Sequence, residues 1–246
     1  IILLTGQGIG PLSSWGRKVA GPVLNRTFAI TCRDPESFFL LQKMGVTSPQ
    51  LYLGVDPLWD YPLPAMPAAL APGSASRPVG FIMRAERITE IRPVLTALKS
   101  RFGGVRLITL SSGDEEAAGR MAGEIGLPPP RPVKTLADFM TCVPELALVL
   151  SQRLHGLLLA ARCGLPGIGL SDDPKVHAFC RQMQWPCWGW AEQDLAAKVI
   201  TAVEGILAGG DTVSERVRQR AAMMEQKGEE DRRWLLQQFR MVLAEE

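Results

Sequence analysis

The chain has 246 residues, of which 46% are hydrophobic, so it can bury a sizeable core as one large or two modest domains. Its 27 basic residues nearly balance its 25 acidic ones, which argues against a nucleic-acid partner and favours local anion sites. No apolar run reaches the roughly 18 to 20 residues of a membrane span, and no signal peptide is visible. These features argue against a disordered, nucleic-acid-binding or membrane-spanning protein.

The first 60 residues alternate between strand and helix patterns and predict part of a first domain. Asp34 can cap a helix, Pro35 suits its first position, and Gly45 suits its C-terminal end. Because the chain opens at once on an apolar, strand-like run, we expect this domain to lack its beginning. The predicted strands are 1–4, 27–32 and 51–53, with one helix after the first strand and another over 35–44.

Residues 61–78 are rich in Pro, Ala, Gly and Ser, a composition typical of a linker. The regular alternation over 79–210 predicts βαβ units and a parallel sheet. We therefore predict an α/β protein with two Rossmann-like parallel-sheet domains, the N-terminal one incomplete. The predicted strands of the second domain are 79–83, 105–110, 146–150 and 167–170, and its main helices are 88–102, 115–125, 154–163 and 174–183.

The tail over 211–246 carries apolar residues at helical intervals and predicts an amphipathic helix. Docking on the protein's own sheet is the favoured interpretation, and a helix offered to a partner or a membrane is the alternative.

The cysteines are odd in number, widely spaced and without a C-x-x-C pair. This pattern argues against a disulfide framework and a zinc site, and nothing else in the sequence requires a metal or a cofactor. Reduced thiols are typical of an intracellular protein, so we expect a cytoplasmic location. The five cysteines are Cys32, Cys142, Cys163, Cys180 and Cys187.

The stretch from Ser151 to Gly156 places Arg153 and His155 where a buried strand hands over to a helix. Ligands of open α/β sheets bind at the carboxyl ends of strands, where helix N-termini offer free N–H groups to anions. Lys175 stands in the same kind of position, at a second predicted helix start. His177 is the only other histidine, and we interpret it as an ordinary helix residue.

Two further arginines, Arg33 and Arg84, also follow predicted strands directly. Each has a carboxylate close by in the sequence, Asp34 or Glu86, so a simple surface ion pair is the alternative for either one. Together with Arg153 and Lys175, they favour a small, highly charged phosphorylated substrate.

The segment from Gly6 to Pro11 follows a strand and contains three glycines, so its backbone N–H groups can approach an anion or a sugar closely. Gln7, Gly8 and Gly10 are the candidate binding residues. The dinucleotide pattern G-x-G-x-x-G fails because Pro11 occupies its last position, and a purely structural turn is the alternative.

Several of these stretches, in this order and spacing, resemble the polysaccharide pyruvyl transferase family over nearly the whole chain up to about Met183. The family's Gly-Asp-Glu segment near the N-terminus is missing, consistent with an incomplete first domain, and its usual Tyr-Asp-Pro-Lys begins with Asp172 here. The matching motifs are Gly6-Gln-Gly-Ile-Gly-Pro11, Thr31-Cys-Arg33-Asp34-Pro-Glu-Ser37, Val55-Asp56-Pro57, Arg153-Leu-His155 and Asp173-Pro-Lys175-Val176.

The resemblance implies transfer of an enolpyruvyl unit from phosphoenolpyruvate to two hydroxyls of one sugar, giving a pyruvate ketal. It also implies a GT-B-like architecture, with 1–60 on the acceptor side and 79–210 binding the donor. Protonating the donor's methylene carbon needs an acid that is charged near neutral pH, and we expect His155 to fill this role. Arg33, Arg84, Arg153 and Lys175 would hold the donor's phosphate and carboxylate.

Other functions stay open at this stage. A nucleotide-sugar glycosyltransferase or epimerase with a GT-B-like fold would also place histidine and arginine near phosphate, and a sugar- or anion-binding module would need no catalyst. The sequence does not identify the general base, although Asp56 and Asp172 are candidates. It also leaves open whether the acceptor is lipid-linked, in which case the enzyme would work peripherally at the cytoplasmic face of a membrane.

Overall fold

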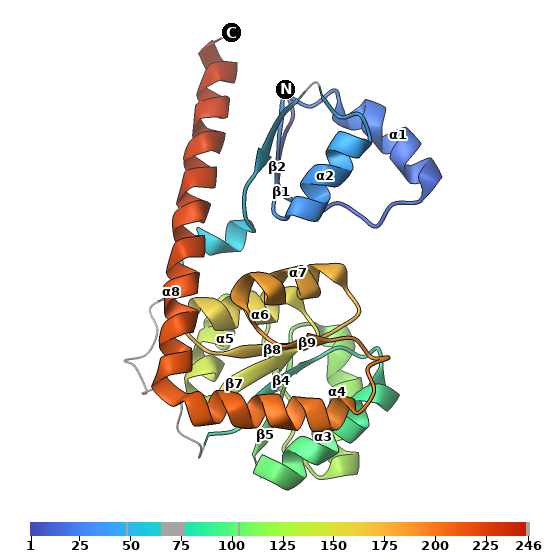
Figure 1. Ribbon diagram of the computed structural model, residues 1–246, viewed down its shortest axis with the longest axis vertical. Helices are drawn as coiled ribbons and strands as arrows, with labels where there is room; N and C mark the ends of the chain where they lie inside the picture. Colours follow the sequence, from blue (N-terminus) through green and yellow to red (C-terminus); the bar gives the residue numbers. More distant parts are fainter. Residues whose placement is uncertain (48, 65–76, 103, 245–246) are drawn as a thin grey trace. The chain divides into compact units, whose positions relative to one another are not determined.

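The computed structural model describes residues 1–47, 49–64, 77–102 and 104–244, and it confirms an α/β protein with two parallel sheets (Figure 1). The chain divides into two compact units. Unit 1 comprises Ile1–Pro62 and Ala222–Glu246, and unit 2 comprises Leu63–Ala221. The C-terminal part of the chain thus returns to the first unit. Of the predicted linker 61–78, residues 65–76 lie outside the described residues.

Unit 1 has a three-stranded parallel sheet in the order β1-β2-β3. Its core joins Ile30 and Cys32 of the central strand to Leu41 and Val46. Asp34 caps α2 as the sequence predicts, because its side chain accepts a hydrogen bond from the Ser37 N–H. The elements are β1 (Leu3–Gln7), α1 (Ser14–Leu24), β2 (Ala29–Cys32), α2 (Pro35–Lys43), β3 (Gln50–Leu53) and the 3-10 helix η1 (Pro57–Trp59).

The first strand ends later than predicted, at Gln7, because it continues past Gly6 by forming a β-bulge. Leu4 pairs with Ile30 and Gln7 with Cys32, so β1 holds one residue more than β2 between these two pairs. Gly6 lies inside this irregular stretch with a φ of 59°, which glycine adopts without strain. The glycine that suggests a strand end in the sequence is thus a bulge residue.

The C-terminal helix α8 (Leu195–Ala244) serves both units and changes direction at Gly210, whose φ is 47° and ψ −128°. Within unit 1 it docks beside β3: the rings of Tyr52 and Trp234 stack with centroids 4.8 Å apart. Arg232 also pairs with Asp60 at 2.6 Å. The amphipathic tail therefore packs on its own chain, and the helix begins well before residue 211.

Asp231 is the buried carboxylate of this docking contact and accepts a hydrogen bond of 3.3 Å from the Val55 N–H. Any Cβ on Gly54 would collide with it, so a glycine is needed there. Burial, followed by the charge of Asp60, raises the pKa of Asp231, although the Val55 N–H opposes this shift. The folded state consequently favours the protonated carboxyl. At neutral pH the carboxyl is ionised, and this buried charge lowers the stability of the folded state.

Replacing this carboxylate, Asp231→Asn, should raise the free energy of unfolding by about 1 kcal/mol at neutral pH. The amide oxygen keeps the Val55 bond while the buried charge disappears. The advantage should vanish as the pH falls through the raised pKa of Asp231, because the wild-type carboxyl is then protonated as well. Urea unfolding at several pH values checks this, and an Asn variant that is less stable at every pH would contradict it.

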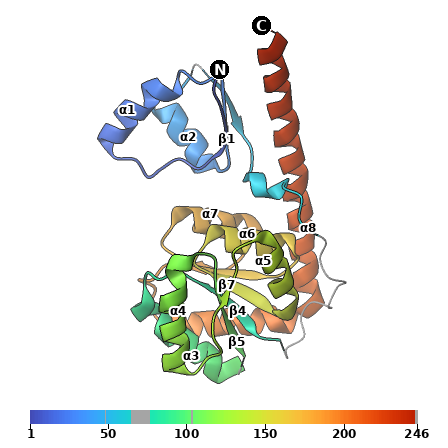
Figure 2. The same cartoon turned by 180° about the vertical axis from the view of Figure 1, so that it is seen from behind.

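Unit 2 contains a six-stranded parallel sheet in the order β6-β5-β4-β7-β8-β9. Figures 1 and 2 show α5, α6 and α7 on one face, while α3, α4 and the first part of α8 pack on the other. The elements are β4 (Val79–Met83), α3 (Ile88–Phe102), β5 (Val105–Thr109), α4 (Ser112–Ile125), β6 (Arg131–Pro132), α5 (Leu136–Cys142), the 3-10 helix η2 (Val143–Glu145), β7 (Leu148–Ser151), α6 (Leu154–Arg162), β8 (Gly167–Leu170), α7 (Pro174–Met183) and β9 (Cys187–Trp188).

This strand order has a switch point between β4 and β7. The chain builds outward from β4 through β5 to β6, then returns to β7 on the other side of β4. The loops that leave β4 and β7 therefore diverge to opposite faces, and a crevice opens at such a point in doubly wound sheets. A ligand site of unit 2 is expected at the carboxyl ends of these two strands.

Among the described residues, no helix is both long enough and apolar enough to cross a membrane. All five cysteines are free thiols, three of them buried. Burial and the nearby charge of Asp34 raise the pKa of Cys32 to about 12, so this thiol has no nucleophilic thiolate near neutral pH.

Candidate active site

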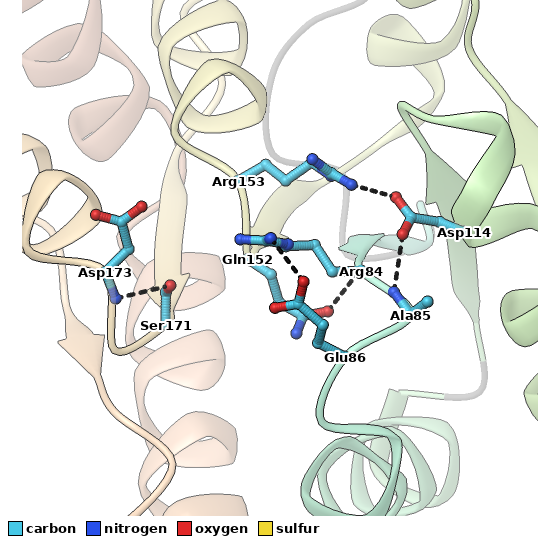
Figure 3. Close-up of polar contacts among 8 residues, drawn as sticks. All are labelled: Arg84, Ala85, Glu86, Asp114, Gln152, Arg153, Ser171 and Asp173. Atoms are coloured by element: carbon cyan, nitrogen blue, oxygen red, sulfur yellow. Dashed lines mark hydrogen bonds and ion pairs between the residues drawn. The ribbon is translucent and has the colours of Figure 1, made fainter. Parts of the chain in front are cut away.

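The ends of β4 and β7 are tied together by Gln152. Its side-chain oxygen accepts a 2.7 Å hydrogen bond from the backbone N–H of Arg84. The backbone N–H of Gln152 donates to the Ile82 carbonyl at 3.1 Å. Gln152 is buried, and Figure 3 shows its side chain pointing toward the Arg84 backbone. Gln152 therefore fixes where Arg84 and Arg153 leave the sheet at the switch point.

Arg153 is held by a carboxylate that the sequence analysis missed. Its Nη2 lies 2.5 Å from Asp114 Oδ2, while Asp114 Oδ1 accepts a 2.8 Å hydrogen bond from the Ala85 N–H (Figure 3). Asp114 is buried in the first turn of α4, whereas the Arg153 side chain remains 29% exposed. The arginine is thus positioned by a buried partner while part of its side chain remains exposed to solvent.

Arg84 has the surface partner that the sequence offers. Its Nη2 lies 2.9 Å from Glu86 Oε1, and the Glu86 side chain is 69% exposed. Exposed pairs of this kind contribute only about 0 to 1 kcal/mol, so an anion can displace Glu86 at little cost. The ion pair and an anion-binding role for Arg84 are therefore compatible.

His155 occupies the first turn of α6, next to Arg153, which is the N-cap residue of this helix. It is exposed, while the neighbouring Gly156 is buried against β4 and β7, where any Cβ would meet Ile82 Cδ1 at 2.5 Å. The Ser151 hydroxyl shapes the turn by accepting from the Arg153 N–H at 3.0 Å and donating to the Arg153 carbonyl at 2.8 Å. The start of α6 thus presents an imidazole and a helix N-terminus at one place.

Lys175 stands at the start of α7, after the neighbouring strand β8. Asp173 caps this helix by accepting from the Lys175 N–H at 3.0 Å, and its own N–H donates to the Ser171 hydroxyl at 3.1 Å. Figure 3 shows Ser171 and Asp173 on this separate strand-to-helix turn. His177 Nε2 is bonded to the Ser171 carbonyl at 2.6 Å, which agrees with a structural role. Lys175 therefore follows the strand beside β7 in the sheet.

The remaining predicted residues belong to unit 1. Arg33 follows β2 and pairs with Asp56 at 2.8 Å, not with the adjacent Asp34. Its N–H donates to the Gln7 carbonyl at 3.1 Å, and its guanidinium lies against Gly8. Gly10 precedes Pro11 through a cis peptide bond. Unit 1 thus gathers Gln7, Gly8 and Arg33 at the carboxyl ends of β1 and β2.

The two candidate bases have separate surroundings. Asp56 is buried, pairs with Arg33, and accepts a 3.1 Å hydrogen bond from the Leu58 N–H. Asp172 follows β8, is exposed, and accepts a 3.0 Å hydrogen bond from the Trp190 N–H. Neither residue belongs to the Arg153–Asp114 pair.

A methyl group at position 8, Gly8→Ala, should displace Arg33 and destabilise the protein by about 1 to 3 kcal/mol. An added Cβ would lie 2.7 Å from Arg33 Nε and 2.8 Å from Nη2, so the guanidinium must move and its pair with Asp56 weakens. Chemical unfolding measures the loss. Gly119→Ala is the control because a Cβ there meets nothing within 4 Å. Equal stability of the two variants would contradict the close approach of Arg33.

Solved structures that resemble the chain define its general class. Sucrose-phosphate synthase from Thermosynechococcus elongatus matches with a TM-score of 0.62 and 14% identity, over 95% of this chain and 63% of that one. The Anabaena protein Alr3699/HepE, in complex with UDP and glucose, matches with a TM-score of 0.61 and 14% identity, over 95% and 70%. The chain thus spans less than two thirds of the synthase. At such identity these likenesses show the fold alone, a GT-B-like α/β architecture.

The family is identified by sequence. The chain belongs to the polysaccharide pyruvyl transferase family, whose sequence model matches residues 2–174, and it is therefore a member of a family of enzymes. No curated protein matches it in sequence. The matched region runs through both units and includes the Gly6–Pro11 segment, Arg153 and His155.

Proposed function

We propose that the protein transfers the enolpyruvyl group of phosphoenolpyruvate to two hydroxyls of one sugar in a cell-surface polysaccharide, forming a cyclic pyruvate ketal. The observation that carries the proposal is the Arg153–Asp114 pair beside His155 at the switch point of unit 2. It combines a positioned cation, a titratable acid and a helix N-terminus where doubly wound sheets bind ligands. Family membership supplies the type of reaction.

Arg84, Arg153 and Lys175 hold the donor in this proposal. The donor carries a phosphate and a carboxylate, and an arginine can pair with either group through two parallel hydrogen bonds, whereas lysine acts as a point charge. The contact with Asp114 already restricts the Arg153 side chain, so the arginine loses little conformational entropy when the donor binds. The N-termini of α6 and α7 add N–H groups and positive dipole ends to the same edge.

His155 is the general acid. It donates a proton to the methylene carbon of phosphoenolpyruvate, which becomes a methyl group while the neighbouring carbon becomes an oxocarbenium-like centre. One sugar hydroxyl adds to that carbon, phosphate then leaves, and the second hydroxyl closes the ketal. The two hydroxyl protons restore the acid and protonate the phosphate. A positioned acid contributes about 10²- to 10⁴-fold in rate.

Unit 1 is the acceptor-side unit in this proposal. Its segment from Gln7 to Gly10, together with Arg33, is proposed to bind substrate. Its backbone comes close to neighbouring groups, because Gly8 lies directly against the Arg33 guanidinium. The reaction as proposed uses no metal or cofactor. The acceptor is a sugar, and if it is lipid-linked, the enzyme works at the cytoplasmic face of a membrane.

A nucleotide-sugar glycosyltransferase is the second candidate, and the structural likeness to Alr3699/HepE in complex with UDP and glucose favours it. Both functions place cations and a histidine near phosphate at the same strand ends. They differ in the donor, since one consumes phosphoenolpyruvate and the other releases a nucleotide. A pure binding module would show neither reaction.

The test is product release from a panel of sugars and lipid-linked oligosaccharides incubated with either donor. Release of inorganic phosphate from phosphoenolpyruvate, together with a new ketal methyl signal on the sugar by NMR, is the expected result. Release of UDP or GDP from a sugar nucleotide, with phosphoenolpyruvate untouched, would replace the proposal by the glycosyltransferase.

A further inference from the structure

Helix α1 of unit 1 exposes an apolar stripe to solvent. Trp15, Val19 and Val23 are 73%, 46% and 61% exposed, and Pro22 is exposed beside them. Spacings of four, seven and eight residues from Trp15 place all four on one side of the helix. We call these four residues the α1 stripe.

The opposite side of α1 is the one that packs on the unit. Gly21 is buried so close to the end of α2 that a Cβ would lie 2.9 Å from the Met44 carbonyl oxygen. Asn25, just after the helix, donates a 2.9 Å hydrogen bond to the Gly45 carbonyl. Figure 1 shows α1 at the outer side of its unit, with α2 drawn between it and the strands. The helix is therefore anchored by its small-residue side, and the α1 stripe faces outward.

The charges around the α1 stripe have one sign. Residues 1–33 contain four basic residues and no Asp or Glu, although the whole chain is nearly neutral. Lys18 lies three residues after Trp15 and so adjoins the stripe, and Arg26 lies just beyond the end of the helix; both are exposed. Arg17, four residues before Gly21, lies on the other side of the helix. Arginine and lysine beside an exposed tryptophan are the combination that interfacial helices use on anionic bilayers.

The other exposed apolar stripe of unit 1, on α8, lacks this charge pattern. Leu236 and Phe239 are 48% and 50% exposed there, but the same stretch of helix mixes the exposed acids Glu229 and Glu230 with basic residues. These carboxylates would be repelled by an anionic surface. The exposed apolar stripe on α8 therefore provides a control surface within the same unit.

We propose that the α1 stripe, with Lys18 and Arg26, binds the surface of an anionic phospholipid bilayer. The apolar side chains enter the headgroup region, Trp15 at its boundary, while the basic residues meet the lipid phosphates. Unit 1 is then held at a membrane without a spanning segment. The inference rests on this surface alone, so it does not depend on the donor chemistry proposed for unit 2.

The test is co-sedimentation of the chain with two kinds of vesicle, one of phosphatidylcholine alone and one in which about a third of the lipid is phosphatidylglycerol. The chain should bind the anionic vesicles and lose binding at high salt. Lys18→Glu with Arg26→Glu should weaken this partitioning at least about tenfold, and Trp15→Ala several-fold. The matched controls, Arg240→Glu and Phe239→Ala on α8, should change it less than about twofold.

Three outcomes would overturn the proposal. One is no binding of the wild-type chain to anionic vesicles, and the second is equal losses from the α1 and α8 variants. The third is a concentration-dependent dimer in analytical ultracentrifugation that Trp15→Ala abolishes, since a second copy would then cover the α1 stripe. Phosphate release from phosphoenolpyruvate on a water-soluble acceptor should be unchanged in Trp15→Ala, which separates this result from the chemistry of unit 2.

Discussion

Removing the carboxylate of Asp114 should destabilise unit 2 and weaken donor binding together. Breaking a buried ion pair by removing one partner typically costs about 3 to 5 kcal/mol, and Asp114→Ala also leaves the Ala85 N–H without its acceptor. Arg153 loses the contact that holds its guanidinium at the end of β7. We expect the free energy of unfolding to fall by about 3 kcal/mol and the Kd for phosphoenolpyruvate to rise at least about tenfold.

One further variant separates the hydrogen bond of Asp114 from its charge, and a second serves as a control. Asp114→Asn retains an acceptor for the Ala85 N–H but removes the charge, so it should recover part of the stability and little of the donor affinity. Glu124→Ala removes a carboxylate from the last turn of the same helix, where it pairs with Arg92 at the surface, and should leave both quantities nearly unchanged. If Asp114→Ala behaved like Glu124→Ala, the buried pair would have no positioning role.

Replacing His155 by alanine should leave donor binding nearly intact and abolish most turnover. The imidazole is exposed at the start of α6 and is not buried in the core, so its removal should change stability by less than about 1 kcal/mol. The rate of phosphate release should fall by about 10²- to 10⁴-fold, because the proton for the methylene carbon then comes from water.

His177→Gln is the matched control for this loss. His177 is the other histidine of the chain and bonds the Ser171 carbonyl, a contact that a glutamine amide can replace. Its turnover should stay within about threefold of wild type. A large loss in His177→Gln, or a Kd for phosphoenolpyruvate that rises as steeply as kcat falls in His155→Ala, would remove His155 from the acid role.

Much of the fold follows from local pattern. The alternation of apolar strands with capped helices predicts most of both parallel sheets, since most of the predicted strands are bounded by a turn signal and followed by a helical period; β6 and β9 are not predicted. The cap at Asp34 and the left-handed residue at Gly45 are local signals of the same kind. Such features depend on a few neighbouring residues, and a single sequence contains them.

The features that local pattern missed depend on distant residues. The predicted helix 115–125 leaves Asp114 just before its start, and only the return of the chain to β7 brings Arg153 to it. Arg33 has an adjacent carboxylate in Asp34 but pairs with Asp56, 23 residues away, because β3 and the turn after it lie beside β2. The sequence places these cations at strand ends but does not show which carboxylate fixes each one.

The C-terminal helix illustrates the same limit. The helical spacing of its apolar residues predicts a docked helix. The sequence around Asp231 does not indicate, however, that this residue contacts Val55, 176 residues away. The glycine at position 54 is the one signal in the sequence, because a Cβ there would collide with Asp231. Long-range closeness of this kind is visible only in the three-dimensional structure.

The most direct test of the central claim is calorimetric titration of phosphoenolpyruvate into the wild-type chain, Arg153→Ala and Arg101→Ala. Arg101 is the control because it also pairs with a carboxylate, Glu204, but lies at the end of α3 remote from the carboxyl edge of the sheet. The account predicts binding to wild type and Arg101→Ala, and a Kd about 10- to 100-fold higher in Arg153→Ala, as expected for a lost charge-assisted pair. No heat from phosphoenolpyruvate, with a UDP- or GDP-sugar binding in a manner that depends on Arg153, would contradict it.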